Sequence, residues 1–578
     1  MTGAASTPRV ARILPDVSGI DKRFDYLVPA QLAERVAIGT RVRISLHGRR
    51  VGGWVTALDP VVAHAGELKP IAKVTGHGPS AEVIELAEWA ALRWAARRTG
   101  SLLVTASPHT ATAHLPPAHR TAAAPAPSSP ATRTLLSAGG GVLRLPPRSD
   151  VLPALFSAAA LGPCLVVAPN QSDSALLAVR LRRAGLSVAL LPDDWGAAAA
   201  GVDVVIGGRA AAWGPCPQLA VALLLDEHDE ALQEERSPTW HARDVMSERC
   251  RRAGVPLVAI SPAPTLVGLA TLAGAGGVLH PPPSRERAGW PTVEVVDRRA
   301  DEPWRRSLVT SELIEHLRAG DRRVVCVSNT TGRARVMACR SCHALLRCEN
   351  CDAAVAMNDV GDLDCTRCGR VRPPVCQQCG AGGFANLRPG VTRLREELEA
   401  AAARPVAAVT GNSDEPAPDV PILVGTEAVL HRARPADVVA FLEFDSEMLA
   451  PRYRAGEQAL ALLIRAGRLA PHVMIQTFVP DHPVIRAAAA GDPDVLVEVE
   501  RERRAMLSLP PFGALAALSG TALEQFLREL PSGDVTVGRD GDRALVRAPN
   551  WDTLATALAV PDRPDGNHLR IEVDPPRV

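Results

Sequence analysis

The residues with the clearest chemical signature in this chain of 578 residues are its cysteines. Eight of the 12 cysteines form four Cys-x2-Cys pairs, which are Cys339 and Cys342, Cys348 and Cys351, Cys365 and Cys368, and Cys376 and Cys379. Two thiolates at this spacing can bind one tetrahedral ion, and two pairs complete a four-thiolate site. The block therefore predicts two structural zinc ions, with every coordination position filled by protein and no place for catalytic water.

The spacing of the cysteines leaves several alternatives open. Sequential, alternating and nested pairings would each close two sites. An iron–sulfur cluster is a second chemistry for such ligands. Buried or disulfide-bonded cysteines are a third interpretation, which a reducing cytoplasm disfavours. Because five arginines lie among the ligands, the block either contacts phosphate or presents a solvated basic surface; they are Arg340, Arg347, Arg367, Arg370 and Arg372.

Composition and charge limit the class of protein. With 47% hydrophobic and 22% charged residues, the chain is globular, and its length predicts three or four domains. The net charge of +1 excludes a uniform positive field, so any anion site must be local. Lysine occurs only at Lys22, Lys69 and Lys73, so no chemistry of an ε-amine is expected in the rest of the chain. We find no signal peptide and no membrane-spanning stretch, which predicts a cytoplasmic protein without a membrane partner.

The remaining sequence predicts the elements that position these residues. Alternating apolar runs between residues 10 and 58 predict a small β domain, and residues 80–98 a helix with Ser80 as its N-cap. Residues 106–132 have the Pro, Ala and Ser content of a linker. From residue 142, nearly continuous apolar runs alternate with helical patterns, which is typical of parallel strands buried on both faces. The cysteine block interrupts a second such region, and the tail from about residue 509 predicts a small α+β domain.

Ten ordered motifs, together with the cysteine pattern, carry a resemblance to a known family. They are FDYLVP at 24–29, GTRVRISL at 39–46, LKPI at 68–71, LAEWAALRWAARRTGSLL at 86–103, VVIGGRAA at 204–211, LLDEHD at 224–229, WHARDV at 240–245, ILVGTE at 422–427, QTFVPDHPVI at 476–485 and ERRAMLSLPPFG at 502–513. In this order they resemble the PriA family of replication-restart proteins over nearly the full length.

The resemblance implies a multidomain α/β fold with five regions along the chain and an insertion in one of them. It implies a DNA 3′-end-binding domain at 1–105, a linker or reduced winged-helix region at 106–141, and two RecA-like helicase lobes at 142–290 and 291–505. It further places a two-zinc insertion at 339–380 in the second lobe and a small α+β C-terminal domain at 506–578. By the same resemblance the zinc pairing is nested: Cys339, Cys342, Cys376 and Cys379 form one site, and Cys348, Cys351, Cys365 and Cys368 form the other.

The resemblance also locates a pocket for a DNA 3′ end. Phe24, Asp25, Tyr26 and Gly39 match the pocket region of the family. A 3′-hydroxyl needs a hydrogen-bonding cup beside a base-stacking ring, and an Asp/Tyr pair would supply both. The alternative is that Phe24 and Tyr26 are strand residues of the β core.

The ATPase motifs of the family are degenerate in this chain. A P-loop needs glycines for close approach to phosphate and a lysine, but residues 143–156 read LRLPPRSDVLPALF. Asp226, Glu227 and His228 resemble Walker B remnants, or are ordinary strand-end polar residues, and Arg468 resembles the nucleotide-facing arginine. Because an arginine without a phosphate cradle stabilises no transition state, ATP binding is doubtful and we predict a helicase fold without turnover.

Three functions remain as hypotheses. The preferred one is binding of forked and single-stranded DNA at abandoned replication forks in the nucleoid, which promotes primosome assembly. Its partners would be primosome proteins, the replicative helicase and its loader, and single-strand-binding protein. The second is an active ATP-dependent 3′→5′ DNA helicase, which fork-dependent ATP turnover would reveal. The third is a zinc-knuckle chaperone or adaptor, which would bind protein clients.

Overall fold

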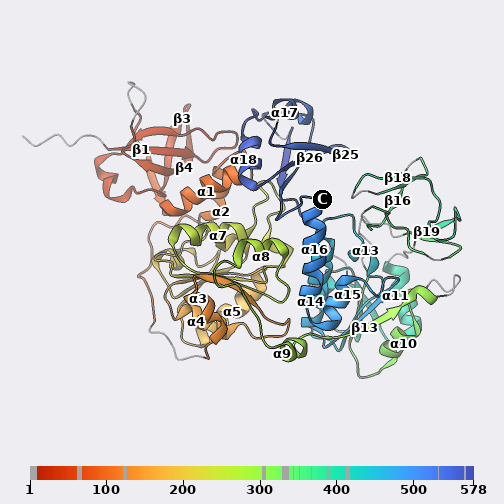
Figure 1. Cartoon of the computed structure of the whole chain (residues 1–578). Coiled ribbons are helices and arrows are strands. Elements are labelled where there is room, and N and C mark those ends of the chain that lie inside the picture. The colour runs from red at the N-terminus through yellow and green to blue at the C-terminus, as the bar shows by residue number, and fades with distance from the viewer. Residues whose placement is uncertain are drawn as a thin grey trace, which may run out of the picture.

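The fold is described from a computed structural model of the whole chain (Figure 1). The structure describes residues 9–61, 68–121, 127–301, 307–328, 337–342, 344–350, 352–358, 360–365, 368–386, 391–409, 417–531, 533–564, 566 and 568–578. Within them, an N-terminal β domain, two α/β lobes, a cysteine module and a C-terminal domain follow one another along the chain.

The N-terminal domain is an antiparallel sheet of five strands in the order β2-β1-β4-β3-β5. The strands are β1 (Val10–Pro15), β2 (Phe24–Leu27), β3 (Arg41–Leu46), β4 (Arg49–Leu58) and β5 (Lys73–Gly76), followed by helices α1 (Ala81–Arg93) and α2 (Gly100–Ala106). Alternate residues such as Ala11, Ile13, Val42 and Ile44 are buried in one core, as the period of a strand requires. Ser80 does precede α1, but its side chain makes no capping hydrogen bond.

The predicted linker is shorter than residues 106–141. Described residues between α2 and Pro130 form no helix or strand, so they contain no winged helix. Helix α3 (Pro130–Ser137) then begins with Ser129 as its N-cap, whose side chain accepts a hydrogen bond from the Thr132 amide. Because β6 (Gly140–Arg144) follows directly, the first lobe begins at about residue 129, and the predicted boundary at 142 falls inside a strand.

Lobe 1 is a parallel sheet of seven strands in the order β12-β6-β11-β10-β7-β9-β8. Its further strands are β7 (Cys164–Val167), β8 (Val188–Leu190), β9 (Val204–Gly207), β10 (Val221–Leu225), β11 (Leu257–Ser261) and β12 (Val278–Leu279). Its further helices are α4 (Leu152–Ala159), α5 (Gln171–Arg183), α6 (Trp195–Ala200), α7 (Ala242–Ala253), α8 (Leu266–Leu272) and α9 (Pro283–Ala288). The five central strands are buried along their whole length, as their continuous apolar runs predict.

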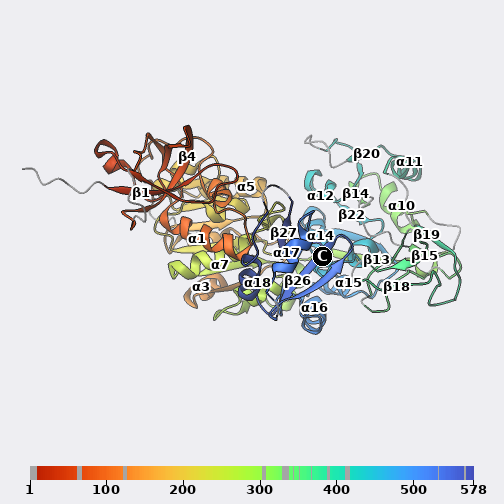
Figure 2. The same ribbon diagram turned by 90° about the horizontal axis from the view of Figure 1, so that it is seen from above.

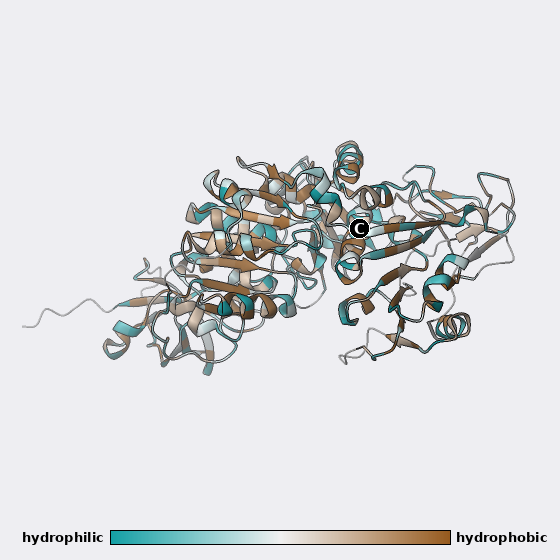
Figure 3. Cartoon of the chain, turned by 90° about the horizontal axis from the view of Figure 1, so that it is seen from below, coloured by the Kyte–Doolittle hydropathy of each residue, from teal (hydrophilic) through white to brown (hydrophobic). Residues whose placement is uncertain are grey.

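Lobe 2 is a parallel sheet of six strands in the order β13-β23-β22-β14-β21-β20. The strands are β13 (Thr292–Asp297), β14 (Val324–Val327), β20 (Val406–Val409), β21 (Ile422–Gly425), β22 (Val438–Phe441) and β23 (His472–Thr477). The helices are α10 (Ser311–Arg318), α11 (Val391–Ala402), α12 (Val429–Arg432), α13 (Asp445–Met448), α14 (Ala455–Leu469), α15 (Pro483–Ala490) and α16 (Asp494–Met506). The strands of both lobes are largely hydrophobic, and the helices turn hydrophilic faces outward (Figure 3).

The cysteine module is inserted into lobe 2 between β14 and α11. It has a two-stranded sheet of β15 (Met337–Cys339) and β19 (Phe384–Asn386) and a three-stranded sheet of β16 (Ala356–Met357), β17 (Leu363–Asp364) and β18 (Val371–Arg372). The Ala354 amide donates a hydrogen bond to the Leu449 carbonyl, which attaches the module to the segment after α13.

The C-terminal domain is an antiparallel sheet of four strands in the order β25-β26-β24-β27 with two helices. Its elements are β24 (Ala514–Ser519), α17 (Leu523–Glu529), β25 (Thr536–Asp540), β26 (Arg543–Ala548), α18 (Trp551–Ala559) and β27 (Arg570–Val573). It lies between the N-terminal domain and lobe 2 (Figure 2). Arg93 of α1 stacks over the Trp551 ring of α18 at 4.0 Å from its centroid. Among the described helices, none has the length and apolar character needed to span a membrane.

Candidate functional sites

Four cysteine sulfurs converge in the cysteine module. The sulfur atoms of Cys339, Cys342, Cys376 and Cys379 all lie within 4.8 Å of one another. The distances from Cys339 Sγ to Cys379 Sγ and from Cys342 Sγ to Cys376 Sγ are both 3.5 Å. Sulfurs at Zn–S bonds of about 2.3 Å in a tetrahedron would lie about 3.8 Å apart, so this set could hold a metal ion.

A second cysteine cluster lies in the same module. Cys348, Cys365 and Cys368 also converge within 4.8 Å, with Cys348 Sγ at 3.4 Å from Cys368 Sγ. Cys351 lies outside the described residues. Each described cluster joins cysteines from non-adjacent stretches of the chain, which is the grouping that the resemblance implied.

A repeated backbone turn positions the cysteines. The amides of Cys348, Cys365 and Cys376 each donate to the carbonyl five residues later. Four residues after each of these cysteines stands a residue with positive φ, namely Asp352 (57°), Gly369 (73°) and Gly380 (74°). Glycine and Asp tolerate this conformation, which closes the knuckle around its two thiols.

The electrostatics of the first cluster favour a thiolate. Burial raises the pKa of Cys339, but hydrogen bonds from the amides of Cys342 and Ser341 and contacts with neighbouring thiols outweigh it and lower the pKa to about 6. Burial and the neighbouring thiols raise the pKa of Cys342 in the same cluster to about 12. Since a thiolate is the form that binds metal, Cys339 is the thiol of this cluster that is ready for a cation at neutral pH, and metal binding has to displace the proton of Cys342.

The arginines of the module are largely paired within it. Arg347 forms an ion pair with Asp352 and Arg370 with Glu349, at 3.2 and 3.3 Å. Arg340 donates to the Phe384 carbonyl and Arg372 to the Val375 carbonyl, whereas Arg367 lies outside the described residues. These contacts favour the solvated surface over the phosphate site.

The loop that would hold phosphate lacks the chemistry of a P-loop. Between β6 and α4, Pro146 and Pro147 supply no backbone N–H, and neither does Pro153 in the first turn of α4. At the start of α4, the Leu152 amide donates to the Asp150 carboxylate at 3.1 Å, so an anion would have to displace a carboxylate. Because the loop also has no glycine and no lysine, the described structure offers no phosphate cradle here.

Two of the charged ATPase remnants, Asp226 and Arg468, form an ion pair with each other across the inter-lobe cleft. Arg468 of α14 pairs with Asp226, which follows β10, at 2.7 Å, and also donates to the Pro147 carbonyl at 3.1 Å. One turn earlier, Arg465 pairs with Asp229 at 2.6 Å. The positive charge of Arg468 and Arg465 lowers the pKa of Asp226 despite its desolvation, which keeps that carboxylate ionised. The arginines of lobe 2 therefore bind carboxylates of lobe 1.

Glu227 and His228 are held inside lobe 1. Glu227 accepts hydrogen bonds from the Thr265 amide and hydroxyl at 2.8 and 2.7 Å and pairs with Arg243 at 3.2 Å. His228 Nδ1 lies 2.9 Å from the Ser261 hydroxyl, and burial lowers the pKa of His228 to about 4. Both residues thus act as buried structural groups, and the cavity beside them has a volume of about 30 Å³, enough for a water but not for a nucleotide.

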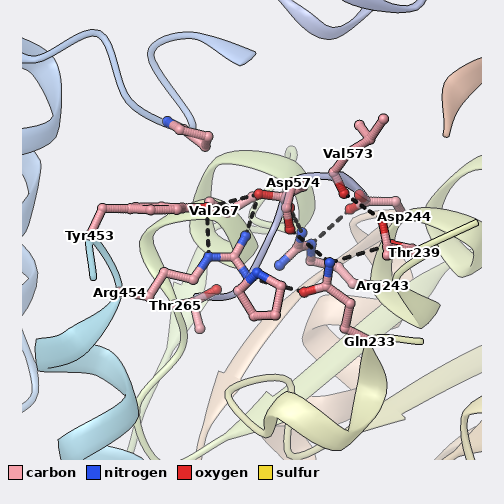
Figure 4. A network of polar contacts seen from close by, with 12 residues as sticks. Gln233, Thr239, Arg243, Asp244, Thr265, Val267, Tyr453, Arg454, Val573 and Asp574 are labelled. Atoms are coloured by element: carbon pink, nitrogen blue, oxygen red, sulfur yellow. Dashed lines mark hydrogen bonds and ion pairs between the residues drawn. The ribbon is translucent and has the colours of Figure 1, made fainter. Parts of the chain in front are cut away.

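A buried polar network joins the two lobes to the C-terminal domain (Figure 4). The carboxylate of Asp574, just after β27, accepts from the Tyr453 hydroxyl at 2.8 Å and from Arg454. Arg243 of lobe 1 lies 3.9 Å away on the other side of the same carboxylate. Gln233 donates to the Asp574 carbonyl at 2.7 Å. The end of the chain therefore fixes the lobes relative to each other.

The sequence analysis did not predict this junction or the ion pair between Arg465 and Asp229. The partners of Asp574 are more than 100 positions away in the chain, so no local spacing indicates them. Arg465 could have been found, because it lies three residues before Arg468 and therefore on the same helix face.

The four residues predicted for the 3′-end pocket do not share one open cavity. Tyr26 is 4% exposed, and its hydroxyl donates to the Ser45 carbonyl at 2.9 Å. Its ring belongs to the β core, with Phe24 packed against the same core, so the predicted stacking role is not available to Tyr26 in this structure. Asp25 points to the opposite face, where Arg12 donates to it at 2.8 and 3.0 Å. Gly39 has a φ of 92°, and a Cβ there would lie 1.8 Å from the Pro79 carbonyl oxygen, so this glycine serves a close backbone approach.

Comparisons with known proteins agree with the motifs. Residues 12–108 match the family model of the PriA 3′DNA-binding domain (3′BD). The chain is 28% identical to the "Probable replication restart protein PriA" of Mycobacterium tuberculosis (strain ATCC 25618 / H37Rv) over 615 residues, covering 95% of this chain and 90% of the relative. It is 28% identical to the "Replication restart protein PriA" of Synechocystis sp. over 379 residues, covering 59% of this chain and 46% of that protein.

Solved structures show weaker similarity. The chain aligns with Escherichia coli DEAH/RHA helicase HrpB at 13% identity and a TM-score of 0.32, covering 62% of this chain and 43% of that chain. It aligns with DUF1998 helicase MrfA bound to DNA and AMPPNP at 12% identity and a TM-score of 0.34, covering 80% and 68%. The similarity to PriA proteins over most of the chain confirms the resemblance predicted from the motifs.

Proposed function

We propose that this chain is a fork-binding platform for replication restart, which recognises abandoned forks and promotes primosome assembly without helicase turnover of its own. The observation that carries the proposal is the match of residues 12–108 to the PriA 3′DNA-binding domain. The same residues fold as a five-stranded sheet followed by α1 and α2, which pack against lobe 1 and the C-terminal domain, so the lobes and that domain support a sheet that could present a DNA end.

The outer face of the N-terminal sheet supports local DNA contact. Arg43, Arg49 and Arg50 on the β3–β4 hairpin are exposed, and the described contacts include no ion pair of theirs. Such cations suit phosphate, which is the local anion site that the near-zero net charge requires. Asp25 and Arg12 lie together on β2 and β1, where a carboxylate could accept a hydrogen bond from a 3′-hydroxyl and a guanidinium could bind its phosphate.

The absence of turnover is supported by the inter-lobe cleft. Nucleotide hydrolysis needs a phosphate cradle and a free arginine. Here the Leu152 amide at the start of α4 already donates to Asp150, and Arg468 is paired with Asp226. ATP binding would therefore have to break ion pairs without gaining the contacts of a P-loop.

The metal and protein partners complete the proposal. Two structural Zn²⁺ ions would be held by the nested cysteine sets, with Cys351 as the fourth ligand of the second set. All-thiolate coordination stabilises a fold and supplies no catalytic water. Forked and single-stranded DNA, primosome proteins, the replicative helicase with its loader and single-strand-binding protein would be the partners of a protein in the nucleoid.

Fork recognition is tested by fluorescence anisotropy at fixed salt with the zinc-loaded protein. The ligands are a three-way fork with a leading-strand 3′-hydroxyl, the same fork with a 3′-phosphate, and linear duplex. We expect the hydroxyl fork to bind most tightly, and Asp25→Asn to remove its advantage over the phosphate fork. Asp59→Asn is the matched control, because Asp59 also pairs with an arginine, Arg9, in the same domain. Equal affinity for all three ligands would refute fork recognition.

The lack of turnover is tested separately. Saturating Mg·ATP should leave the melting temperature unchanged, since a ligand stabilises only a protein that binds it. Fork-stimulated ATP hydrolysis by the wild type that Arg468→Ala abolishes would establish the active helicase instead.

A further inference from the structure

Three potential metal ligands from three elements of lobe 2 meet far from the cysteine module in sequence. Glu294 lies on β13, His316 on α10 and His472 at the start of β23. Their ligand atoms all lie within 4.8 Å of one another. His316 Nε2 is 2.9 Å and His472 Nε2 2.6 Å from the same oxygen, Glu294 Oε2.

The fold fixes this arrangement. Strands β13 and β23 pair in parallel with Thr292 opposite His472 and Glu294 opposite Met474, so Glu294 and His472 are diagonal neighbours on one face. Helix α10 contributes His316 one residue before Leu317, which is buried in the core. The side chains are partly exposed, at 12% for His316, 27% for His472 and 31% for Glu294, so an ion in solution could reach them.

We propose that Glu294, His316 and His472 form a third metal site, which takes a divalent transition-metal ion of the Zn²⁺ type and leaves one position open to water. Two imidazoles and one carboxylate are a ligand set that such ions accept. Metal–ligand bonds of about 2.1 Å would separate the ligand atoms by about 3.4 Å, so each imidazole has to withdraw by less than about 1 Å.

Arg322 opposes the ion and so regulates its affinity. The Arg322 guanidinium lies 2.7 Å from His316 Nδ1. Arginine can only donate, so Nδ1 accepts, and the single proton of the neutral imidazole is on Nε2, where it is donated to Glu294. When a metal binds Nε2, this proton moves to Nδ1 and Arg322 must turn away, which its exposed side chain permits.

The site differs chemically from the cysteine centres, and this difference provides the experiment. The zinc-loaded protein, with its thiolate sites filled, is titrated with Co²⁺ and followed by calorimetry and visible absorption. We expect one further equivalent to bind, with weak visible bands and without the intense sulfur-to-cobalt charge transfer of a thiolate site. Metal analysis after dialysis against excess Zn²⁺ should agree with one equivalent beyond the cysteine sites.

Variants decide whether these residues hold the ion. Glu294→Gln and His472→Gln should each weaken binding of the further equivalent at least tenfold, while Arg322→Gln should strengthen it. His280→Gln, an exposed histidine of lobe 1, is the matched control. Two variants are tested so that one that fails to fold does not decide the result, and melting temperatures are measured alongside. No further equivalent in the wild type, or one that both variants retain, would overturn the proposal.

Discussion

The buried carboxylate of Asp574 offers a direct test of how the three parts of the molecule are held together. The substitution is Asp574→Asn, which keeps the size of the side chain. Asparagine also tolerates the φ of 56° at this position. The variant removes the charge that faces Arg454 and Arg243, whereas the backbone hydrogen bond from Gln233 remains.

The expected magnitude follows from burial. The side chains of Asp574 and Arg243 are 1% and 2% exposed, and that of Arg454 is 12% exposed. Removing one partner of a buried ion pair leaves an uncompensated charge and costs about 3–5 kcal/mol. At about 1.4 kcal/mol per tenfold change, the population of the opened junction should rise roughly a hundredfold to several thousandfold.

The assay is hydrogen exchange, because a chain of several domains does not unfold in two states. Peptides covering residues 233–246 and 452–458 should lose protection in the variant. Asp542→Asn, at the exposed turn between β25 and β26, should leave them unchanged. If the protection factors of these peptides fall by less than tenfold in the variant, the claim that this ion pair fixes the lobes is refuted.

The pH dependence follows from the same group. Desolvation raises the pKa of Asp574, but Arg454 and Arg243 outweigh it and hold that pKa well below its usual range. The carboxylate therefore stabilises the fold at every pH above its unfolded pKa of about 3.9, and this stabilisation is lost only as the pH falls through the lower folded value. The difference in the stability of the junction between the wild type and Asp574→Asn, measured by hydrogen exchange, should therefore be constant from pH 8 to about pH 5.5.

Two further predictions concern lobe 2. Removing metal with a chelator should abolish exchange protection in residues 337–386 while both parallel sheets stay protected, because thiolate ligation stabilises a small module with little core of its own; loss of protection in the sheets would contradict this. Desolvation raises the pKa of Asp445 to about 6, so ionisation of this group destabilises the fold as the pH rises from about 4 to 6. The melting temperature of Asp445→Asn relative to wild type should therefore be higher at pH 7.5 than at pH 5, and an equal difference at both pH values would contradict the assignment.

The sequence predicts the sheets well because their signal is local. A strand buried on both faces needs a continuous apolar run, and the runs at 164–167, 204–207 and 221–225 are such strands. The cysteine knuckles are also local, since three of the described turns that begin at a cysteine reach their residue with positive φ within five positions.

Other features need information that spacing does not contain. Ser129 and Pro130 have the composition of a linker, but the same two residues are an N-cap and a first helical position, and only packing of α3 on the sheet decides between them. Alternation places Asp25 and Tyr26 on opposite faces of β2, but the sequence does not tell which face meets the core. The structure places Tyr26 on the buried face.

Helix α14 connects the two lobes through charged side chains along one of its faces. Glu457, Arg465 and Arg468 are spaced by 8 and 3 residues, so they lie along one face of the helix. Glu457 accepts from the Leu266 amide of α8, and the two arginines bind Asp229 and Asp226. In a nucleotide-driven motor, arginines at such an interface meet phosphate, and the separation of the lobes follows the ligand. In this structure carboxylates of lobe 1 supply the negative charge that meets these arginines. The proposed function as a fork-binding platform requires that these ion pairs hold the lobes at one separation.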